Sequence, residues 1–65
     1  MLSLKIKRIK EGFTQKELAK KSGVGVATIH RIEKNGIETI PVYTLRKLAK
    51  ALNTTVHELF FSEDD

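Results

Sequence analysis

Residues 15–34 have the sequence QKELAKKSGVGVATIHRIEK, which is typical of two short helices joined by a tight turn. Thr14 and Glu17 fit a capping box at the start of the first helix, and Gly23 suits its end. The second helix is expected from about Val26 to Lys34. Two helices that cross through a tight turn need a small residue, a glycine and apolar residues where they meet. The residues at those places are Ala19, Gly23, Val24, Ile29 and Ile32.

Further helices are predicted on both sides of this pair, so we expect one all-α domain of five helices over residues 1–61. An apolar stripe with spacings of four, three and four predicts a first helix that ends at Gly12. The core-facing residues of this stripe are Leu2, Ile6, Ile9 and Phe13. A fourth helix is expected over residues 42–52, with Leu45, Leu48, Ala49 and Leu52 inward. A short fifth helix carries Val56, Leu59 and Phe60, and residues 62–65 form an acidic tail.

Positive charge is concentrated in the first half of the chain. Residues 1–34 hold nine Lys and Arg against three Glu, a net charge of +6, whereas residues 35–65 have a net charge of −2. A basic half favours a polyanionic partner, either nucleic acid or an anionic membrane surface. The alternative is a charged face that only contacts water.

The chain resembles the phage-repressor and Cro family of helix-turn-helix regulators, often called the XRE family. The residues that carry this resemblance are 13–19, 22–24, 28–29, 31–33 and 45–52. The resemblance extends from about Leu4 to Phe60. It implies a lambda-repressor-like fold and a sequence-specific DNA-binding regulator, a repressor or a controller-like protein. In such proteins the second helix of the motif lies in the major groove of double-stranded DNA.

The resemblance also implies which side chains contact DNA. Val26, Ala27 and Arg31 occupy the positions that contact bases: an arginine can bind guanine O6 and N7, and small apolar groups can touch a thymine methyl. For Arg31 the alternative is a solvated cation. Contacts to the phosphate backbone are expected from Gln15, Lys16, Thr28, Lys34, Asn35 and Tyr43. For Lys16, Lys34 and Tyr43, ordinary surface exposure is the alternative.

Arg8 and Glu33 match an inward-facing ion pair that is found in some family members, with two independent surface charges as the alternative. Two positions depart from the family pattern. Gly25 stands where many members have a Ser or Thr that caps the recognition helix. Val26 and Ala27 replace polar side chains that contact bases in some relatives, so more of the discrimination falls on Arg31, on methyl contacts and on DNA shape.

No residues in the sequence suggest catalysis, a metal or a cofactor. Cysteine is absent, His30 and His57 have no ligand-like spacing, and Gly23-Val24-Gly25 is not followed by the Lys and Ser or Thr of a phosphate-binding loop. The sequence has no apolar run near 18 residues and no signal-peptide pattern. We therefore expect a soluble cytoplasmic protein, associated with the nucleoid, that is neither an enzyme nor a membrane protein.

Two hypotheses of different classes remain at this point. One is a regulator that binds a palindromic operator as a homodimer. The other is an antitoxin-like or coactivator-like module that uses the same fold to bind a protein partner. A dimer surface is expected around Val56, Phe60 and Phe61, because these side chains offer more apolar area than a short helix can bury. The alternative is that all three side chains pack only into the core of their own chain.

Overall fold

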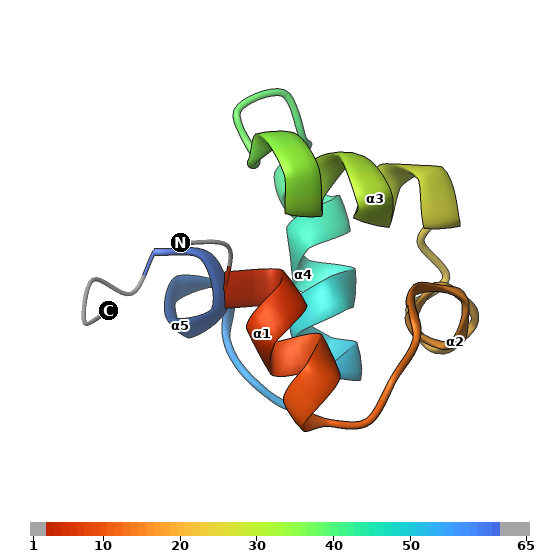
Figure 1. Ribbon diagram of the computed structural model, residues 1–65. Helices are drawn as coiled ribbons and strands as arrows, with labels where there is room; N and C mark the ends of the chain where they lie inside the picture. Colours follow the sequence, from red (N-terminus) through yellow and green to blue (C-terminus); the bar gives the residue numbers. More distant parts are fainter. Residues whose placement is uncertain (1–2, 62–65) are drawn as a thin grey trace.

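The computed structural model describes residues 3–61, and within them the chain forms five α-helices and no strand. Their bounds are α1 Ser3–Lys10, α2 Gln15–Ser22, α3 Val26–Asn35, α4 Val42–Ala51 and α5 Val56–Phe60. In Figure 1, α4 lies in the centre with α1 in front of it, α2 on one side and α5 on the other, while α3 crosses one end. The expected all-α architecture of five helices is confirmed. The expected acidic tail, residues 62–65, lies outside the described residues.

The helix boundaries follow from side-chain caps and glycines. The Thr14 hydroxyl accepts a hydrogen bond from the Glu17 amide at 3.0 Å, and the Glu17 carboxylate accepts one from the Thr14 amide at 2.9 Å. These are the two halves of the predicted capping box, which fixes the start of α2. Gly23 ends α2 with a φ of 78°, a left-handed conformation that strains residues with a Cβ.

Apolar side chains from all five helices and from the turn between α2 and α3 form the core. Leu18 of α2, Ile29 of α3 and Leu48 of α4 are fully buried. The remaining buried apolar residues are Leu4, Val24, Ile32, Leu45, Ala49, Ala51, Leu52 and Leu59. The predicted inward positions of α3 and α4 are therefore confirmed, and Ala19 of α2 packs partly against the core. Helix α3 contacts both α2 and α1.

The predicted first helix is present as α1, but the predicted inward placement of Ile6 and Ile9 was wrong. Ile6 is 45 % exposed and Ile9 is 57 % exposed, whereas Leu4 and Arg8 are the residues of α1 that face the interior. Phe13 packs partly against the core, and Leu2 lies outside the described residues. The physical reason is that Arg8 has buried partners, described below, so the face that carries Arg8 turns inward and the isoleucines turn outward.

Candidate nucleic-acid interface

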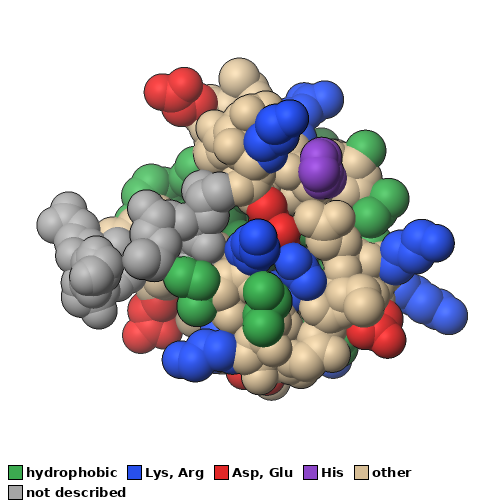
Figure 2. Space-filling model, in the orientation of Figure 1, with side chains coloured by type: hydrophobic (Ala, Val, Ile, Leu, Met, Phe, Trp, Pro, Cys, Tyr) green, Lys and Arg blue, Asp and Glu red, His purple; other side chains and the backbone are tan. Residues whose placement is uncertain are grey.

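Helix α3 has one buried side and one exposed side. Ile29, Ile32 and Glu33 are buried, while Val26, Ala27, His30, Arg31 and Lys34 are exposed. The exposed positions are three and four residues apart, which places them along one face of a helix. Figure 2 shows histidine, hydrophobic and basic side chains exposed together over α3. The exposed edge of α3 therefore carries small apolar, histidine and basic side chains.

The three positions expected to contact bases all lie on this edge. Val26 is the first residue of α3 and is 41 % exposed, and Ala27 beside it is exposed. Arg31 follows one turn later, and within residues 3–61 its guanidinium forms neither a hydrogen bond nor an ion pair. Its five N–H donors are free for an external acceptor.

The expected phosphate contacts lie at several places around α3. Gln15 and Lys34 line one shallow hollow, together with Lys5, His30 and Glu33. Lys16 is exposed in the first turn of α2, and Thr28 is half-buried in α3. Asn35 ends α3, whereas Tyr43 lies on α4, where Lys47 Nζ sits 5.5 Å from its ring centre. Lys34 and Gln15 are thus brought together, and Tyr43 is not among the residues of that hollow.

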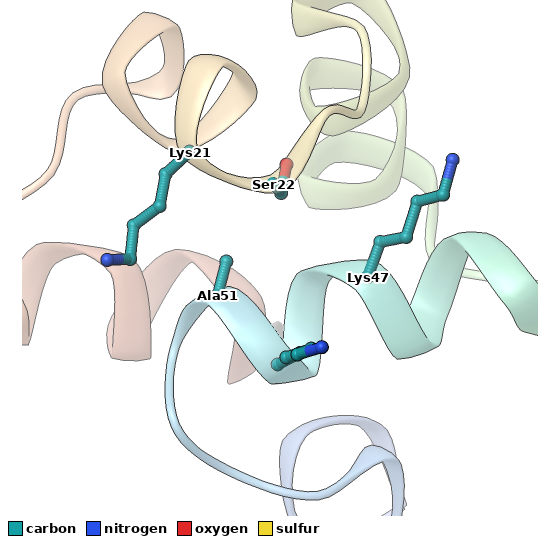
Figure 3. A pocket seen from close by; sticks show the side chains of 5 residues that line it. Lys21, Ser22, Lys47 and Ala51 are labelled. Atoms are coloured by element: carbon teal, nitrogen blue, oxygen red, sulfur yellow. The ribbon is translucent and has the colours of Figure 1, made fainter.

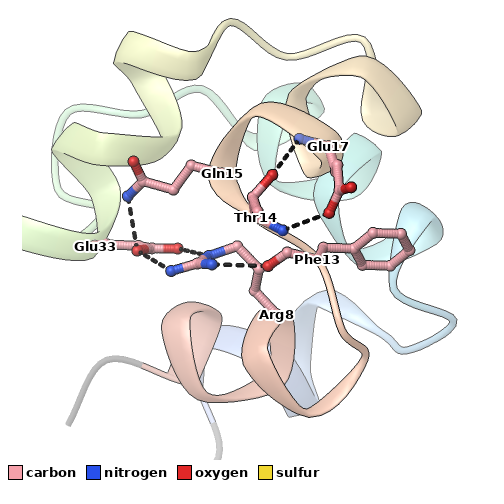
Figure 4. Close-up of polar contacts among 6 residues, drawn as sticks. All are labelled: Arg8, Phe13, Thr14, Gln15, Glu17 and Glu33. Atoms are coloured by element: carbon pink, nitrogen blue, oxygen red, sulfur yellow. Dashed lines mark hydrogen bonds and ion pairs between the residues drawn. The ribbon is translucent and has the colours of Figure 1, made fainter.

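A buried polar network holds α3 in place (Figure 4). Arg8 Nε donates to Glu33 Oε2 at 2.7 Å, and Arg8 Nη2 donates to Glu33 Oε1 at 3.1 Å. Arg8 Nη1 donates to the Phe13 carbonyl at 2.8 Å, and Gln15 Nε2 donates to Glu33 Oε1 at 2.9 Å. Arg8 is 9 % exposed and Glu33 is 7 % exposed, so the two side chains form a buried, bidentate ion pair.

The network sets the charge of Glu33. Burial by itself would raise the pKa of this carboxyl group, but the hydrogen bonds from Arg8 and Gln15 and the charges of Arg8 and Lys5 act in the opposite direction. The balance leaves the Glu33 pKa below its ordinary value. Glu33 is therefore ionised at neutral pH and keeps α1, the start of α2 and the last turns of α3 together.

Two features of this site were not predicted from the sequence. The first is the hydrogen bond from Gln15 to Glu33, which joins residues 18 positions apart. The second is the grouping of His30 with Lys5 around the hollow beside α3. Helical spacing offered a signal for His30, since it lies three residues after Ala27 on the exposed face. No spacing rule relates Lys5 on α1 to a residue of α3.

A second shallow hollow lies between the ends of α2 and α4 and is lined by Lys21, Ser22, Lys47, Lys50 and Ala51 (Figure 3). Two of its three lysines are explained without a ligand. Lys21 and Lys50 are in the last turns of their helices, where a cation offsets the negative end of the helix dipole. Lys21 Nζ also sits 5.6 Å from the centre of the Phe13 ring.

Neither a metal centre nor a membrane span is found in residues 3–61. This part of the chain contains no group of three or more His, Cys, Asp or Glu side chains that is placed to hold a metal ion. It also contains no helix with the length and apolar character needed to cross a bilayer.

Comparison with known proteins gives one match. A protein-family model described as "Helix-turn-helix" matches residues 4–59, which is most of the 65-residue chain. No curated protein and no solved structure matches the chain. The matched residues include all of α2, α3 and α4 and the whole Arg8–Glu33 network.

Proposed function

The chain belongs to the helix-turn-helix family of the Cro and lambda-repressor type, a family of DNA-binding regulators, and on that premise we propose that it binds specific DNA sequences by placing α3 in the major groove. The observation that carries the proposal is the exposed edge of α3 from Val26 to Arg31. An α-helix fits the major groove, which is about 12 Å wide, and an exposed edge is what base contact requires.

We assign base recognition to Val26, Ala27 and Arg31. The Arg31 guanidinium can donate two hydrogen bonds to guanine O6 and N7, and the two small side chains can contact thymine methyl groups. The core below α3 supports this assignment, because a rigid helix positions its side chains more accurately than a loop does.

Contacts to the phosphate backbone of DNA position the domain on the duplex but do not distinguish one base from another. We assign them to Gln15, Lys16, Thr28, Lys34, Asn35 and Tyr43. Gln15 fits this role because one N–H of its amide binds Glu33, which fixes the side chain, and the second N–H is free to donate to a phosphate. Gln15 also begins α2, where the helix dipole favours an anion.

We further propose that the protein acts as a homodimer on a palindromic operator. Two-fold related recognition helices would then lie one turn of DNA apart, about 34 Å. Of the expected dimer residues, Val56 and Phe60 pack partly against the core, while Phe61 is 52 % exposed and is free to contact a partner. A cytoplasmic, nucleoid-associated regulator without enzymatic activity is consistent with these roles.

Selection of bound duplexes from a random pool, followed by mobility shifts across a salt series, tests the proposal. We expect a palindromic consensus. The affinity should fall by about 10²-fold between 50 and 200 mM salt, because Lys16 and Lys34 of both copies would neutralise about four phosphates, which then release their counterions. If no duplex from the pool binds even at low salt, the proposal is wrong, and a protein-binding role for the same fold takes its place.

A further inference from the structure

The shallow hollow beside α3 brings together side chains from three helices. It is lined by Lys5 of α1, Gln15 of α2, and His30, Glu33 and Lys34 of α3. Lys5 lies three residues before Arg8, so both side chains leave α1 on the side that faces α3. Figure 2 shows basic side chains between α1 and α3, with a histidine over α3 beside them. The hollow therefore joins α1 to the exposed edge of α3.

The hollow has an excess of positive charge. Among the described residues that line it, Glu33 alone is acidic, and its carboxylate already accepts two hydrogen bonds from Arg8 and one from Gln15. Burial raises the Glu33 pKa and Lys5 is among the charges that lower it, so Lys5 lies near this carboxylate. Within residues 3–61, neither Lys5 nor Lys34 forms an ion pair. Because Arg8 offsets the charge of Glu33, the two lysines remain without a counter-charge.

The same side chains offer hydrogen-bond donors to an anion. The Gln15 amide has two N–H groups, and Glu33 accepts a hydrogen bond from only one of them (Figure 4). A lysine ammonium group has three N–H donors, and an imidazole ring has at least one. Lys5 and His30 use none of these donors within residues 3–61. An anion with several acceptor oxygens fits this arrangement, and a phosphodiester group is such an anion.

The position of the hollow fits the backbone of a duplex that α3 enters. A helix in the major groove has one sugar-phosphate backbone on each side, because the groove lies between the two strands. The hollow lies on the side of α3 that faces α1, at His30, which follows Ala27 by three residues and precedes Arg31. With the edge of α3 in the groove, one of the two backbones therefore passes over the hollow.

We propose that one backbone phosphate of the bound duplex sits in this hollow, where Lys5 and His30 contact it together with Gln15 and Lys34. The proposal rests on the proposed function, and it adds α1 to the DNA-binding surface. The buried pair of Arg8 with Glu33 positions these donors, because it connects α1 to α3 and Glu33 also holds Gln15. Since phosphate contacts carry no sequence information, Lys5 and His30 position the duplex and do not select bases.

Titrations of the full chain against the selected operator and random DNA test the two new contacts. Lys5→Gln should weaken binding about tenfold on both duplexes, because each of two bound copies loses one ion pair. His30→Ala should also weaken binding to both duplexes by equal factors. The matched control is Lys10→Gln, which should bind like the wild type, since Lys10 is an exposed lysine of α1 that does not line the hollow. Normal binding of Lys5→Gln would overturn the proposal, and a loss of His30→Ala on the operator alone would remove His30 from it.

Uncharged phosphate analogues test whether the donors of different helices meet at one phosphate. Each phosphate of the operator is replaced in turn, in both half-sites, by a methylphosphonate. At the phosphate in the hollow, the replacement should weaken the wild type about tenfold but Lys5→Gln only about twofold, because the variant has already lost the charge that the phosphate pairs with. Gln15→Ala should lose part of its response at the same phosphate. Responses that shrink at different phosphates in the two variants, or at none, would contradict a shared site.

The same titrations separate this inference from the proposed function. If Arg31→Ala loses its preference for the operator while Lys5→Gln binds normally, recognition by α3 stands and the hollow is not a phosphate site. If the wild type binds no duplex, the proposed function is wrong and the inference falls with it. Circular dichroism of Lys5→Gln and Lys10→Gln should show the helix content of the wild type, because both lysines are exposed. A loss of binding in Lys5→Gln then reports on the contact and not on folding.

Discussion

The Arg31 guanidinium lies on the exposed edge of α3 without a partner in residues 3–61, so its removal should leave the fold intact and affect binding. Arg31→Ala should cost about 1–3 kcal/mol on the selected operator and relax the preference at one base pair. Gln15→Ala should instead weaken binding to all sequences alike. Titrations of both variants against the operator and random DNA measure the difference. Equal losses of Arg31→Ala on both duplexes would contradict its assigned role.

Protonation of Glu33 in acid should lower the free energy of unfolding of the protein. Its pKa in the folded state is below the ordinary value of 4.5, so the folded state binds fewer protons than the unfolded state below that pH. The stabilisation from Glu33 is therefore present above about pH 4.5 and is lost as the pH falls through the lowered pKa.

Glu33→Gln tests this sign. At pH 7 the variant should lose about 3 kcal/mol of unfolding free energy, because Arg8 keeps its buried charge without the carboxylate. The loss should shrink as the pH falls toward 3, since the wild type then loses the same contribution. Thermal unfolding followed from pH 7 to pH 3 gives both curves. Curves that stay parallel over this range would show that the Glu33 carboxylate does not titrate as described.

At the scale of single residues, the sequence allowed part of the site to be predicted. The pair of Arg8 with Glu33 and the positions of Val26, Ala27 and Arg31 on the recognition helix were expected from a family resemblance. The hydrogen bond from Gln15 to Glu33 was not expected, because the partner of a neutral amide depends on which helices meet and not on any local pattern.

The two glycines of the turn between α2 and α3 should respond differently to substitution. Gly23 has a φ of 78°, so Gly23→Ala should cost about 1 kcal/mol from backbone strain alone, as an added Cβ there has no atom within 4 Å. Gly25 has an extended φ of −62° at the N-cap of α3, so Gly25→Ser should be neutral or gain a few tenths of a kcal/mol.

Thermal unfolding of the two variants without DNA provides the measurement. For a domain of this size, 1 kcal/mol shifts the melting temperature by about 4–8 °C, which is readily resolved. Gly25→Ser is the matched control, because it adds a side chain to the same turn without the left-handed conformation. A similar loss in both variants would mean that crowding, and not backbone conformation, limits the turn.

Helix positions were predictable because caps and glycines act locally. Thr14 and Gly23 stand at the boundaries that the sequence indicated. The orientation of α1 was not predictable in the same way. Its period identifies a face that carries Ile6 and Ile9, but the period cannot tell whether that face or the face of Leu4 turns inward. The buried partners of Arg8, which come from Phe13 and α3, decide the orientation.

For the whole molecule, the proposed two-fold dimer would make the DNA affinity depend on the distance between half-sites. Insertion of five base pairs between the half-sites of the selected operator rotates them by about half a turn of DNA, since one turn is about 10–10.5 base pairs. The dimer should then bind with the affinity of one half-site, and insertion of a full turn should restore part of the loss. Mobility shifts on the three duplexes measure this. Affinity that is independent of the spacing would argue for independent monomers.

The division of α3 into a buried and an exposed side has an evolutionary consequence. Ile29, Ile32 and Glu33 maintain the fold, whereas Val26, Ala27 and Arg31 contribute little to it. Under the proposed base contacts, substitutions at the exposed positions would alter which DNA sequence is preferred while leaving folding almost unaffected. A duplicated gene for such a protein could acquire a new set of DNA targets through a few codon changes, and every intermediate variant would still fold.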